Sequence, residues 1–447
     1  MAEIWVFLLA GASLVLLGFA AAQVFDRFRI PDYFILMAIG LVLGSGLLPL
    51  GGLDPRASLA SIAPLLTSVA LAFILFEGGL VLHVRGVGKV WGVAAAHTAA
   101  AMGLSIAGVW FVGTQLLGFG PSTSLIMALA FCGPSATIVL SFLPRSGVEP
   151  RTRFVLTVEG VMGNIVAAVL VLLLVRLPGN ASDIAAWAPF FLNIGATLVV
   201  AYLVGEGWAK AVGGPNPRSF AFMSSVALAV LLYAMGEGLL GGNGGLAAFV
   251  FGLALGHRRV LAAPQPATPG SRGLQEFHRE LVFLLRTFFF LYLGLRVTLG
   301  GITETTLFGA IAFALVFYAS RLPSSTAIAR TWRLPLLDSG ILRATVARGM
   351  TDTVLILYAI EAGVVPAAEA TRVTDLLFIV IVVAAAMSAG LVMTAEWVAR
   401  RASARTTHAP TAPSSHVVEV ADQVPEHLDR ALAEFLEDPI VKRGHID

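Results

Sequence analysis

Two neighbouring stretches of this chain combine helix-breaking residues, hydroxyls and a carboxylate within apolar sequence. Residues 131–137 read Phe-Cys-Gly-Pro-Ser-Ala-Thr, with the break at Gly133 and Pro134, and residues 159–164 begin with Glu159. In lipid, each unpaired backbone group costs several kcal/mol, so such a break persists only where it packs against protein or lines a water-filled cavity. In secondary transporters these breaks bind the substrate. The pattern therefore predicts an ion pathway beside a buried carboxylate.

A third stretch, residues 348–353, reads Arg-Gly-Met-Thr-Asp-Thr in an apolar frame. A charged side chain at the centre of a membrane helix costs on the order of 2.5 to 3.5 kcal/mol, so each one is a functional hypothesis. The charged residues that we place at membrane depth are Glu77, Glu159, Arg286, Arg348 and Asp352. An arginine stays protonated at any working pH, which leaves the carboxylates as candidates for proton exchange.

Composition places the chain among multi-pass membrane proteins. Its 447 residues are 57% hydrophobic and only 13% charged, and a mean hydropathy of +0.86 excludes a soluble domain of average composition. The one cysteine, Cys132, excludes an intramolecular disulfide, and we expect it to be a small apolar filler. The first apolar segment lacks a basic leader and a small-residue cleavage site, so we expect it to be a retained span.

Apolar segments of roughly 17 to 25 residues are long enough to cross a bilayer. By this criterion we predict an all-α protein with about thirteen transmembrane helices. The segments lie at residues 3–23, 33–50, 62–82, 90–115, 122–143, 153–176, 185–209, 219–240, 244–257, 281–299, 302–322, 341–362 and 372–399. The ninth is short and rich in glycine, so we expect a tilted or partly unwound crossing there.

Basic residues occupy alternate loops between these segments, and the intervening loops are nearly free of them. The basic positions are Arg27, Arg29, His83, Arg85, Lys89, Arg145, Arg151, Arg153, Lys210, Arg218, His257, Arg258, Arg259, Arg272, Arg330, Arg333, Arg400 and Arg401. By the positive-inside rule, this pattern predicts an N-terminus outside the cell and a C-terminus in the cytoplasm. The location expected is the inner or plasma membrane.

The composition divides the chain into two regions. Residues 1–401 form the predicted transmembrane domain, and residues 402–447 change to Ser, Thr and Pro and then to an acidic stretch. We expect a mostly disordered cytoplasmic tail there. Residues 425–438 place four apolar side chains on one helical face, which suits a short amphipathic helix within that tail.

Each half of the predicted membrane domain contains one interrupted apolar segment. The fifth segment is interrupted at Gly133 and Pro134, and the twelfth at Gly349. If segments one to six and eight to thirteen are inverted-topology repeats, these two discontinuous helices are equivalent and cross near the bilayer midplane. The partial charges at their half-helix ends then need compensation.

Six motifs follow one another along the membrane region. They are residues 73–80, the broken fifth segment, Glu159 at the start of the sixth-segment motif, residues 244–252, residues 285–295, and Arg348 with Gly349. In this order they resemble the NhaP-like branch of the cation:proton antiporters. The resemblance implies an NhaA/NhaP-like fold, monovalent cations and protons as ligands, and a homodimer in which a six-helix core moves against a dimerisation bundle. We expect no cofactor and no metal beyond the transported cation.

The chain departs from the family pattern at two positions. Where the family reads Thr-Asp-Pro in the fifth segment, this chain has Cys132, Gly133 and Pro134. Where the family reads Asn-Asp in the sixth, it has Gly163 and Asn164. An amide can coordinate a cation but cannot carry a proton, so the titrating group must lie elsewhere.

We expect Asp352 to replace the carboxylate that is missing from the sixth segment, as the carrier of cation and proton. Relatives commonly have a small hydroxyl residue at this position, which lies across the same crossing point. The alternative is a pair with Arg348, four residues earlier on one helical face. The cation-first order is the poorer one on a helix, and Gly349 between them favours an unwound turn.

The remaining predicted ion ligands are oxygen-bearing side chains near the same crossing: Asn164, Glu77, Ser135, Thr137 and Thr351. For Glu77 the alternative is a carboxylate at a helix end that the cytoplasm wets. For Ser135 and Thr137 the alternative is a hydroxyl bonded to the carbonyl one turn earlier.

Two further predictions concern arginines. Glu159 and Arg348 most resemble the family's buried pair between the sixth and twelfth segments, so we expect a structural ion pair between them. Arg286 is expected to snorkel or to pair within the bundle.

These residues predict a secondary transporter that exchanges Na⁺ or K⁺ for H⁺ by alternating access, one for one and without net charge movement. The alternative is a degenerate scaffold that has lost proton coupling and acts as a channel-like protein or a sensor. An enzyme is not expected, because the sequence has no His-Glu-x-x-His and His97 stands alone in the fourth segment. Scattered basic residues give no indication of nucleic-acid binding.

Overall fold

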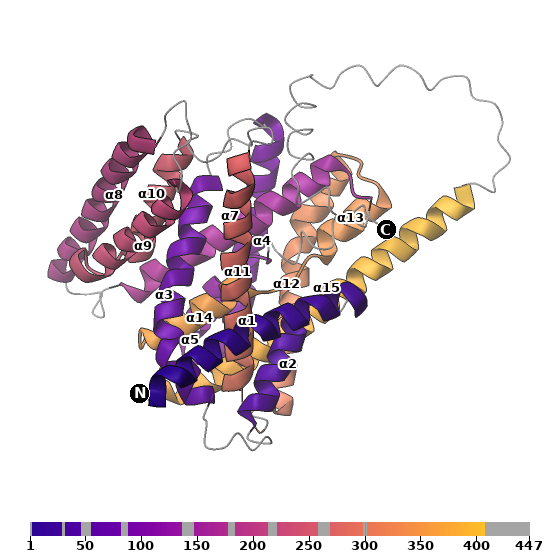
Figure 1. Ribbon diagram of the computed structural model, residues 1–447. Coiled ribbons are helices and arrows are strands. Elements are labelled where there is room, and N and C mark those ends of the chain that lie inside the picture. The colour runs from indigo at the N-terminus through magenta and orange to yellow at the C-terminus, as the bar shows by residue number, and fades with distance from the viewer. Residues whose placement is uncertain are drawn as a thin grey trace.

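The computed structural model describes residues 2–28, 32–45, 55–81, 88–135, 147–177, 184–212, 221–257, 269–297, 300 and 302–406. Over these ranges the chain is helical, with short connections and no strand (Figure 1). The helices are α1 (Ala2–Phe28), α2 (Asp32–Gly44), α3 (Pro55–Val81), α4 (Gly88–Phe111), the π-helix η1 (Val112–Leu116), α5 (Pro121–Ala130), α7 (Pro150–Val175), α8 (Ile184–Val212), α9 (Ala221–Leu239), α10 (Gly244–His257), α11 (Pro269–Arg296), α12 (Glu304–Thr331), α13 (Leu336–Ala344), α14 (Met350–Glu361) and α15 (Ala367–Thr406). The all-α class predicted from the sequence is confirmed.

Six helical stretches in the described ranges are long and apolar enough to cross a membrane by length and composition. They are Leu59–Leu80, Trp91–Leu116, Pro150–Val175, Trp187–Val212, Glu304–Thr331 and Ala367–Ala402. Shorter apolar helices include α2, which precedes the first of them in the sequence, and α5, α9 and α10, which lie between them. Each predicted transmembrane segment therefore contains at least one helix, which is what a multi-pass membrane protein requires.

The fifth and twelfth segments are interrupted where the sequence predicts. The helix α5 ends at Ala130, and residues 131–135 continue without helical structure. The twelfth segment consists of two short helices, α13 and α14, separated by the non-helical residues 345–349. In the ninth segment, α10 is helical without interruption from Gly244 to His257, so of the two expected alternatives the unwinding is absent. Its glycines serve close packing rather than unwinding.

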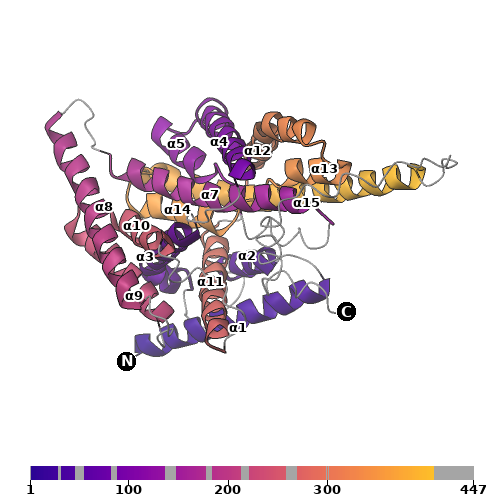
Figure 2. The ribbon, with the colours of Figure 1, turned by 90° about the horizontal axis from the view of Figure 1, so that it is seen from above.

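The helices form two groups by their mutual contacts. The core group is α4, α5, α7, α12, α13, α14 and α15, and the scaffold group is α1, α2, α3, α8, α9, α10 and α11. In both views α8 and α9 lie at one side of the molecule and α12 and α13 at the other (Figures 1 and 2). The groups meet mainly where α3 and α11 pack against α14 and where α3 packs against α7.

Two closely packed helix pairs reveal the internal repeat within the scaffold group. In α2, Gly40 and Gly44 lie against the backbone of α11 so closely that a Cβ on either would overlap it. In α10, Gly252 and Gly256 lie in the same way against the backbone of α3. Small residues four apart allow such approach in membrane helices. The second segment thus pairs with the tenth, and the third pairs with the ninth. Swapping the two equivalent halves converts one of these pairs into the other, as an internal repeat requires.

Polar contacts join the two groups at the end of the bundle where α7, α9 and α14 finish. Arg176, which follows α7, donates from Nη2 to Oε2 of Glu237 in α9 at 2.5 Å and to the hydroxyl of Tyr358 in α14 at 3.0 Å. Thr67 of α3 lies 3.5 Å from Oε1 of Glu361, the last residue of α14. The predicted tail helix at 425–438 lies outside the described residues.

Candidate functional site

The two interrupted segments meet and bond to each other. The backbone N–H of Ser135 donates to the carbonyl of Ala347 at 2.9 Å, so the non-helical stretch of one segment contacts that of the other directly. The guanidinium of Arg348 donates to the carbonyl of Gly133. Arg348 therefore pairs a carbonyl of the non-helical stretch that follows α5. The predicted crossing of two discontinuous helices is present.

The break in the fifth segment is held against α7 by two glycines. A Cβ on Gly133 would lie 2.7 Å from the carbonyl carbon of Gly163, and a Cβ on Gly163 would lie 2.9 Å from Cα of Gly133. Both distances are too short for side chains. Asn164, the next residue of α7, is half-buried. The two positions at which the chain departs from the family pattern are thus in contact across the crossing.

Asp352 lies in the first turn of α14 and is only 2% exposed. Its Oδ2 accepts from the backbone N–H of Gly349 at 2.5 Å, so the carboxylate caps the start of the half-helix, where partial positive charge gathers. Within the described part of the chain Asp352 makes no ion pair with Arg348, because residues 345–349 are unwound. The predicted alternative of an intrahelical pair is therefore wrong.

Arg348 is buried and has a different partner from the one predicted. Its guanidinium carbon lies 3.8 Å from the centroid of the Phe317 ring in α12, in addition to the bond with Gly133. A cation over an aromatic face is stabilised by the quadrupole of the ring. The predicted ion pair between Glu159 and Arg348 is absent among these contacts, and that prediction is wrong.

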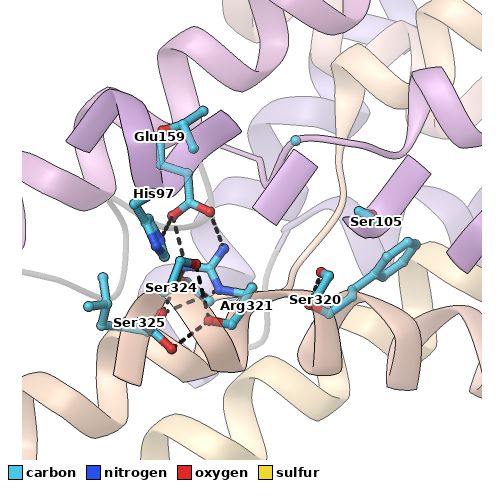
Figure 3. Close-up of polar contacts among 12 residues, drawn as sticks. His97, Ser105, Glu159, Ser320, Arg321, Ser324 and Ser325 are labelled. Carbon is cyan, nitrogen blue, oxygen red and sulfur yellow. Dashed lines mark hydrogen bonds and ion pairs between the residues drawn. The ribbon is translucent and has the colours of Figure 1, made fainter. Parts of the chain in front are cut away.

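Glu159 pairs instead with Arg321 of α12. The guanidinium donates from Nη1 to Oε1 at 2.5 Å and from Nη2 to Oε2 at 2.7 Å, a two-pronged contact between fully buried groups (Figure 3). The same Nη2 donates to the carbonyl of Leu342 and to Oγ1 of Thr345, each at 2.8 Å. Arg321 therefore holds the end of α13 and the start of the unwound segment.

His97 of α4 completes this cluster. Its Nε2 lies 3.4 Å from Oε2 of Glu159, so the histidine that stood alone in the sequence faces the buried ion pair (Figure 3). Sequence reasoning missed Arg321 because the predicted segment ended at residue 322, which placed that arginine at the membrane edge. The helix α12 continues to Thr331, so Arg321 lies well inside it, and the uncharged run of residues 322–329 after the arginine was the available signal.

The structure places the remaining predicted site residues as follows. Ser135 is buried at the crossing, and Thr351 is half-buried in the first turn of α14. Glu77 is half-buried on α3, four residues before that helix ends at Val81. Thr137 lies outside the described residues. The crossing therefore brings together Gly133, Ser135, Gly349 and Asp352, with Asn164 beside them.

Two expectations about single residues are met. Arg286 of α11 forms an ion pair with Asp32 of α2, with Nη2 and Oδ2 2.6 Å apart, so it pairs within the bundle. Cys132 is 3% exposed and belongs to the apolar core. Among the residues that the structure describes, no three His, Cys, Asp or Glu side chains converge as ligands of a resident metal would.

A multi-pass helical protein in which two equivalent halves cross at interrupted helices, with a buried carboxylate at the crossing, defines the class of secondary transporters with inverted repeats. The family is shown by sequence. The model of the family described as "Sodium/hydrogen exchanger, transmembrane" matches residues 11–399, so the chain belongs to that family.

Comparison with characterised proteins agrees with this assignment. The K(+)/H(+) antiporter NhaP of Alkalimonas amylolytica is 25% identical over 369 residues, which are 78% of this chain and 60% of that protein. The chain thus spans 60% of the length of this relative. The sodium proton antiporter MjNhaP1 of Methanocaldococcus jannaschii, in a structure at pH 8, superposes with a TM-score of 0.70 at 18% identity, covering 87% of this chain and 99% of that one. A second structure of MjNhaP1, from electron microscopy, gives 0.64 at 18% identity, with 88% and 97% covered. The NhaP-like fold is therefore shared.

Proposed function

We propose that the protein exchanges a monovalent cation, Na⁺ or K⁺, for H⁺ by alternating access, and that Asp352 carries both ions in turn. The observation that carries the proposal is the position of Asp352, a buried carboxylate at the start of a half-helix where two interrupted segments meet. Such half-helix ends form the ion sites of transporters with inverted repeats. Membership in the exchanger family supports the same conclusion.

We infer that further oxygen ligands lie near Asp352 and suit a cation that has lost part of its water shell. In this proposal Ser135 and Thr351 contribute hydroxyls, and Asn164, which follows Gly163 on α7, contributes an amide oxygen. These groups cannot take up a proton, whereas the carboxylate can. Competition between cation and proton for Asp352 then produces exchange without a second titrating site, one ion for one ion. Glu77 of α3 completes the set either as a further ligand or along the path from the cytoplasm.

The test is cation-driven dissipation of a pH gradient in liposomes containing the purified protein. The assay follows an internal pH dye after addition of Na⁺, K⁺ or Li⁺. We expect Asp352→Asn to reduce exchange to the level of liposomes without protein, because an amide cannot titrate. Asp338→Asn is the matched control, since Asp338, in the first turn of α13, is also buried but accepts from the backbone N–H of Glu149, which precedes α7, away from the crossing. Exchange that persists in Asp352→Asn would contradict the assignment.

A second candidate is a scaffold that no longer couples to protons and acts as a channel-like protein or a sensor. The observation in its favour is the contact between Gly133 and Gly163, which leaves no room for a carboxylate in the fifth segment. This candidate predicts no cation-driven pH change in the wild-type protein with any of the three cations. A single positive result with wild type therefore decides against it.

The arrangement in the cell follows from the alternate basic loops and from the family. We infer an N-terminus outside, a cytoplasmic C-terminus in the inner or plasma membrane, and a homodimer assembled through the scaffold group. In this arrangement residues 1–401 transport ions and residues 402–447 form a cytoplasmic tail. Labelling of single cysteines introduced into loops, in a Cys132→Ser background, tests the orientation from each side of the membrane.

A further inference from the structure

An ion pair joins the core group to the scaffold group at one end of the bundle. Arg176 follows α7 of the core group and Glu237 belongs to α9 of the scaffold group, with Nη2 and Oε2 2.5 Å apart. The same Nη2 donates to the hydroxyl of Tyr358 in α14 at 3.0 Å, so the guanidinium also ties two core helices together. Alternating access moves one group of helices against the other, and this pair lies across the boundary between them.

Each partner is anchored in its own group. Oε1 of Glu237 accepts from the backbone N–H of Gly244 at 3.3 Å, so the carboxylate caps the start of the scaffold helix α10. On the core side, Tyr358 lies six residues after Asp352 on α14, about 9 Å along the helix. The other core helix, α7, is the one that packs against the break at the crossing. The two helices that shape the crossing therefore both end at the guanidinium of Arg176.

The connection between α9 and α10 closes over this guanidinium. Gly242 has a φ of +80°, and a Cβ there would overlap Cζ of Arg176. Glycine permits both this backbone conformation and this close approach. The side chains of Arg176 and Glu237 are still 30% and 27% exposed, so the pair lies at a water-facing end of the bundle. Such a pair can separate without leaving a fully buried charge unpaired.

We propose that Arg176, Glu237 and Tyr358 form a latch that closes the path between the crossing and this end of the molecule, and that the latch opens once in each transport cycle. The proposal rests on the proposed function, because it assumes alternating access. It assigns this structure to the state in which the crossing opens to the opposite side. In the orientation inferred above, the latch is outside, since the sixth and twelfth segments both run outward. Its members are positioning residues, because they touch no transported ion.

The first test prevents the latch from opening. The variant Arg176→Cys with Glu237→Cys, in a Cys132→Ser background, is joined by a bis-methanethiosulfonate reagent about as long as the ion pair. Dissipation of the pH gradient in liposomes is measured before and after the reaction. We expect cross-linking to reduce exchange to the level of liposomes without protein, and a reductant to restore it. Exchange that continues unchanged after complete cross-linking would overturn the proposal.

A matched cross-link within the scaffold group is the control. Asp32 and Arg286 form a similarly short ion pair, at 2.6 Å, between α2 and α11, which belong to the same group. The variant Asp32→Cys with Arg286→Cys, joined by the same reagent, should exchange ions as fast after cross-linking as before. An equal loss of exchange in both cross-linked proteins would count against the latch.

The second test needs no transport. The variant Ser135→Cys, in the Cys132→Ser background, reports which side of the membrane reaches the crossing, because this position is buried there. A membrane-impermeant maleimide is added on the latch side. We expect Glu237→Gln to raise the labelling rate from that side by about two- to fivefold, the effect of losing a partly exposed ion pair. Asp32→Asn should leave the rate unchanged, and the same rate in Glu237→Gln would overturn the latch.

The two proposals fail in different ways. If Asp352→Asn still exchanges ions, the carrier assignment is wrong, but the labelling of Ser135→Cys is unaffected. If Asp352→Asn abolishes exchange, while neither cross-linking nor labelling responds to the latch, only the latch is excluded.

Discussion

At the scale of single residues, the absence of a carboxylate at position 133 goes together with close backbone packing. The backbone of Gly133 lies directly against that of Gly163, and a Cβ at either position would overlap the other chain. A side chain at position 133 therefore requires the break and α7 to separate. The carboxylate at the crossing instead comes from Asp352, on the opposite interrupted segment, where the start of α14 stabilises negative charge.

The pair of Glu159 and Arg321 provides a prediction about stability. We expect Arg321→Ala to lower the free energy of unfolding by about 3 to 5 kcal/mol, because it leaves the buried carboxylate of Glu159 without the arginine that balances its charge. The double variant Glu159→Gln with Arg321→Met removes both charges and should recover most of that loss. Thermal unfolding in detergent of wild type, Glu159→Gln, Arg321→Met and the double variant completes a double-mutant cycle and measures the coupling. Additive losses would show that the two side chains do not interact.

At the scale of helices, close packing through glycine fixes the scaffold group. Gly252 of α10 and Gly40 of α2 occupy equivalent places in the two halves, each against the backbone of a partner helix. The same feature explains why α10, although rich in glycine, remains helical: its glycines let α3 approach along its length, and this packing offsets their low helix propensity.

This packing predicts different effects for two glycine-to-alanine changes. We expect Gly252→Ala to destabilise the protein by about 1 to 3 kcal/mol, because the added methyl group overlaps the backbone at Phe76 and α3 must shift. Gly195→Ala in α8 is the control, since a Cβ there meets nothing within 4 Å, and alanine is the better helix former by up to about 1 kcal/mol. Equal melting temperatures for the two variants would count against the assignment.

The sequence was sufficient to locate the helices, but it did not show which buried charged side chains pair with one another. Hydropathy located the spans because burial in lipid acts on each segment alone, and the glycines and proline located both interruptions. The partner of Glu159 could not be found in this way. His97 and Arg321 come from different helices, and their meeting depends on how α4, α7 and α12 pack. The resemblance to the family favoured Arg348, which here lies against Gly133 and Phe317.

At the scale of the whole molecule, the charges at the crossing determine what exchange does to the membrane voltage. Arg348 is a fixed cation and Asp352 is the only carboxylate that we assign to carry ions. A carrier loaded with one proton and a carrier loaded with one Na⁺ or K⁺ then have the same charge. Under the proposed mechanism, the charge movements of the two halves of the transport cycle cancel, and we expect exchange to move no net charge.

The substitution Asn164→Asp tests the proposal that one proton is exchanged for one cation. The change places a second titratable group beside the crossing, at the position where relatives have an aspartate, and two protons can then move against one cation. We expect a transient current on a solid-supported membrane or a voltage-dependent rate, where wild type shows neither. The test uses a Na⁺ or K⁺ jump at constant pH. A current in wild type would contradict the one-for-one proposal directly.

The bond between Ser135 and Ala347, together with the contact from Arg348 to Gly133, ties the two non-helical stretches into one piece. Neither stretch can rotate on its own without breaking its contacts with the other. An ion bound there would therefore move together with both stretches as one rigid unit. The binding site keeps its shape, and what changes is the side of the membrane to which it opens. The surfaces that move past each other then lie further out, along α3 and α11, where the scaffold group contacts the core group.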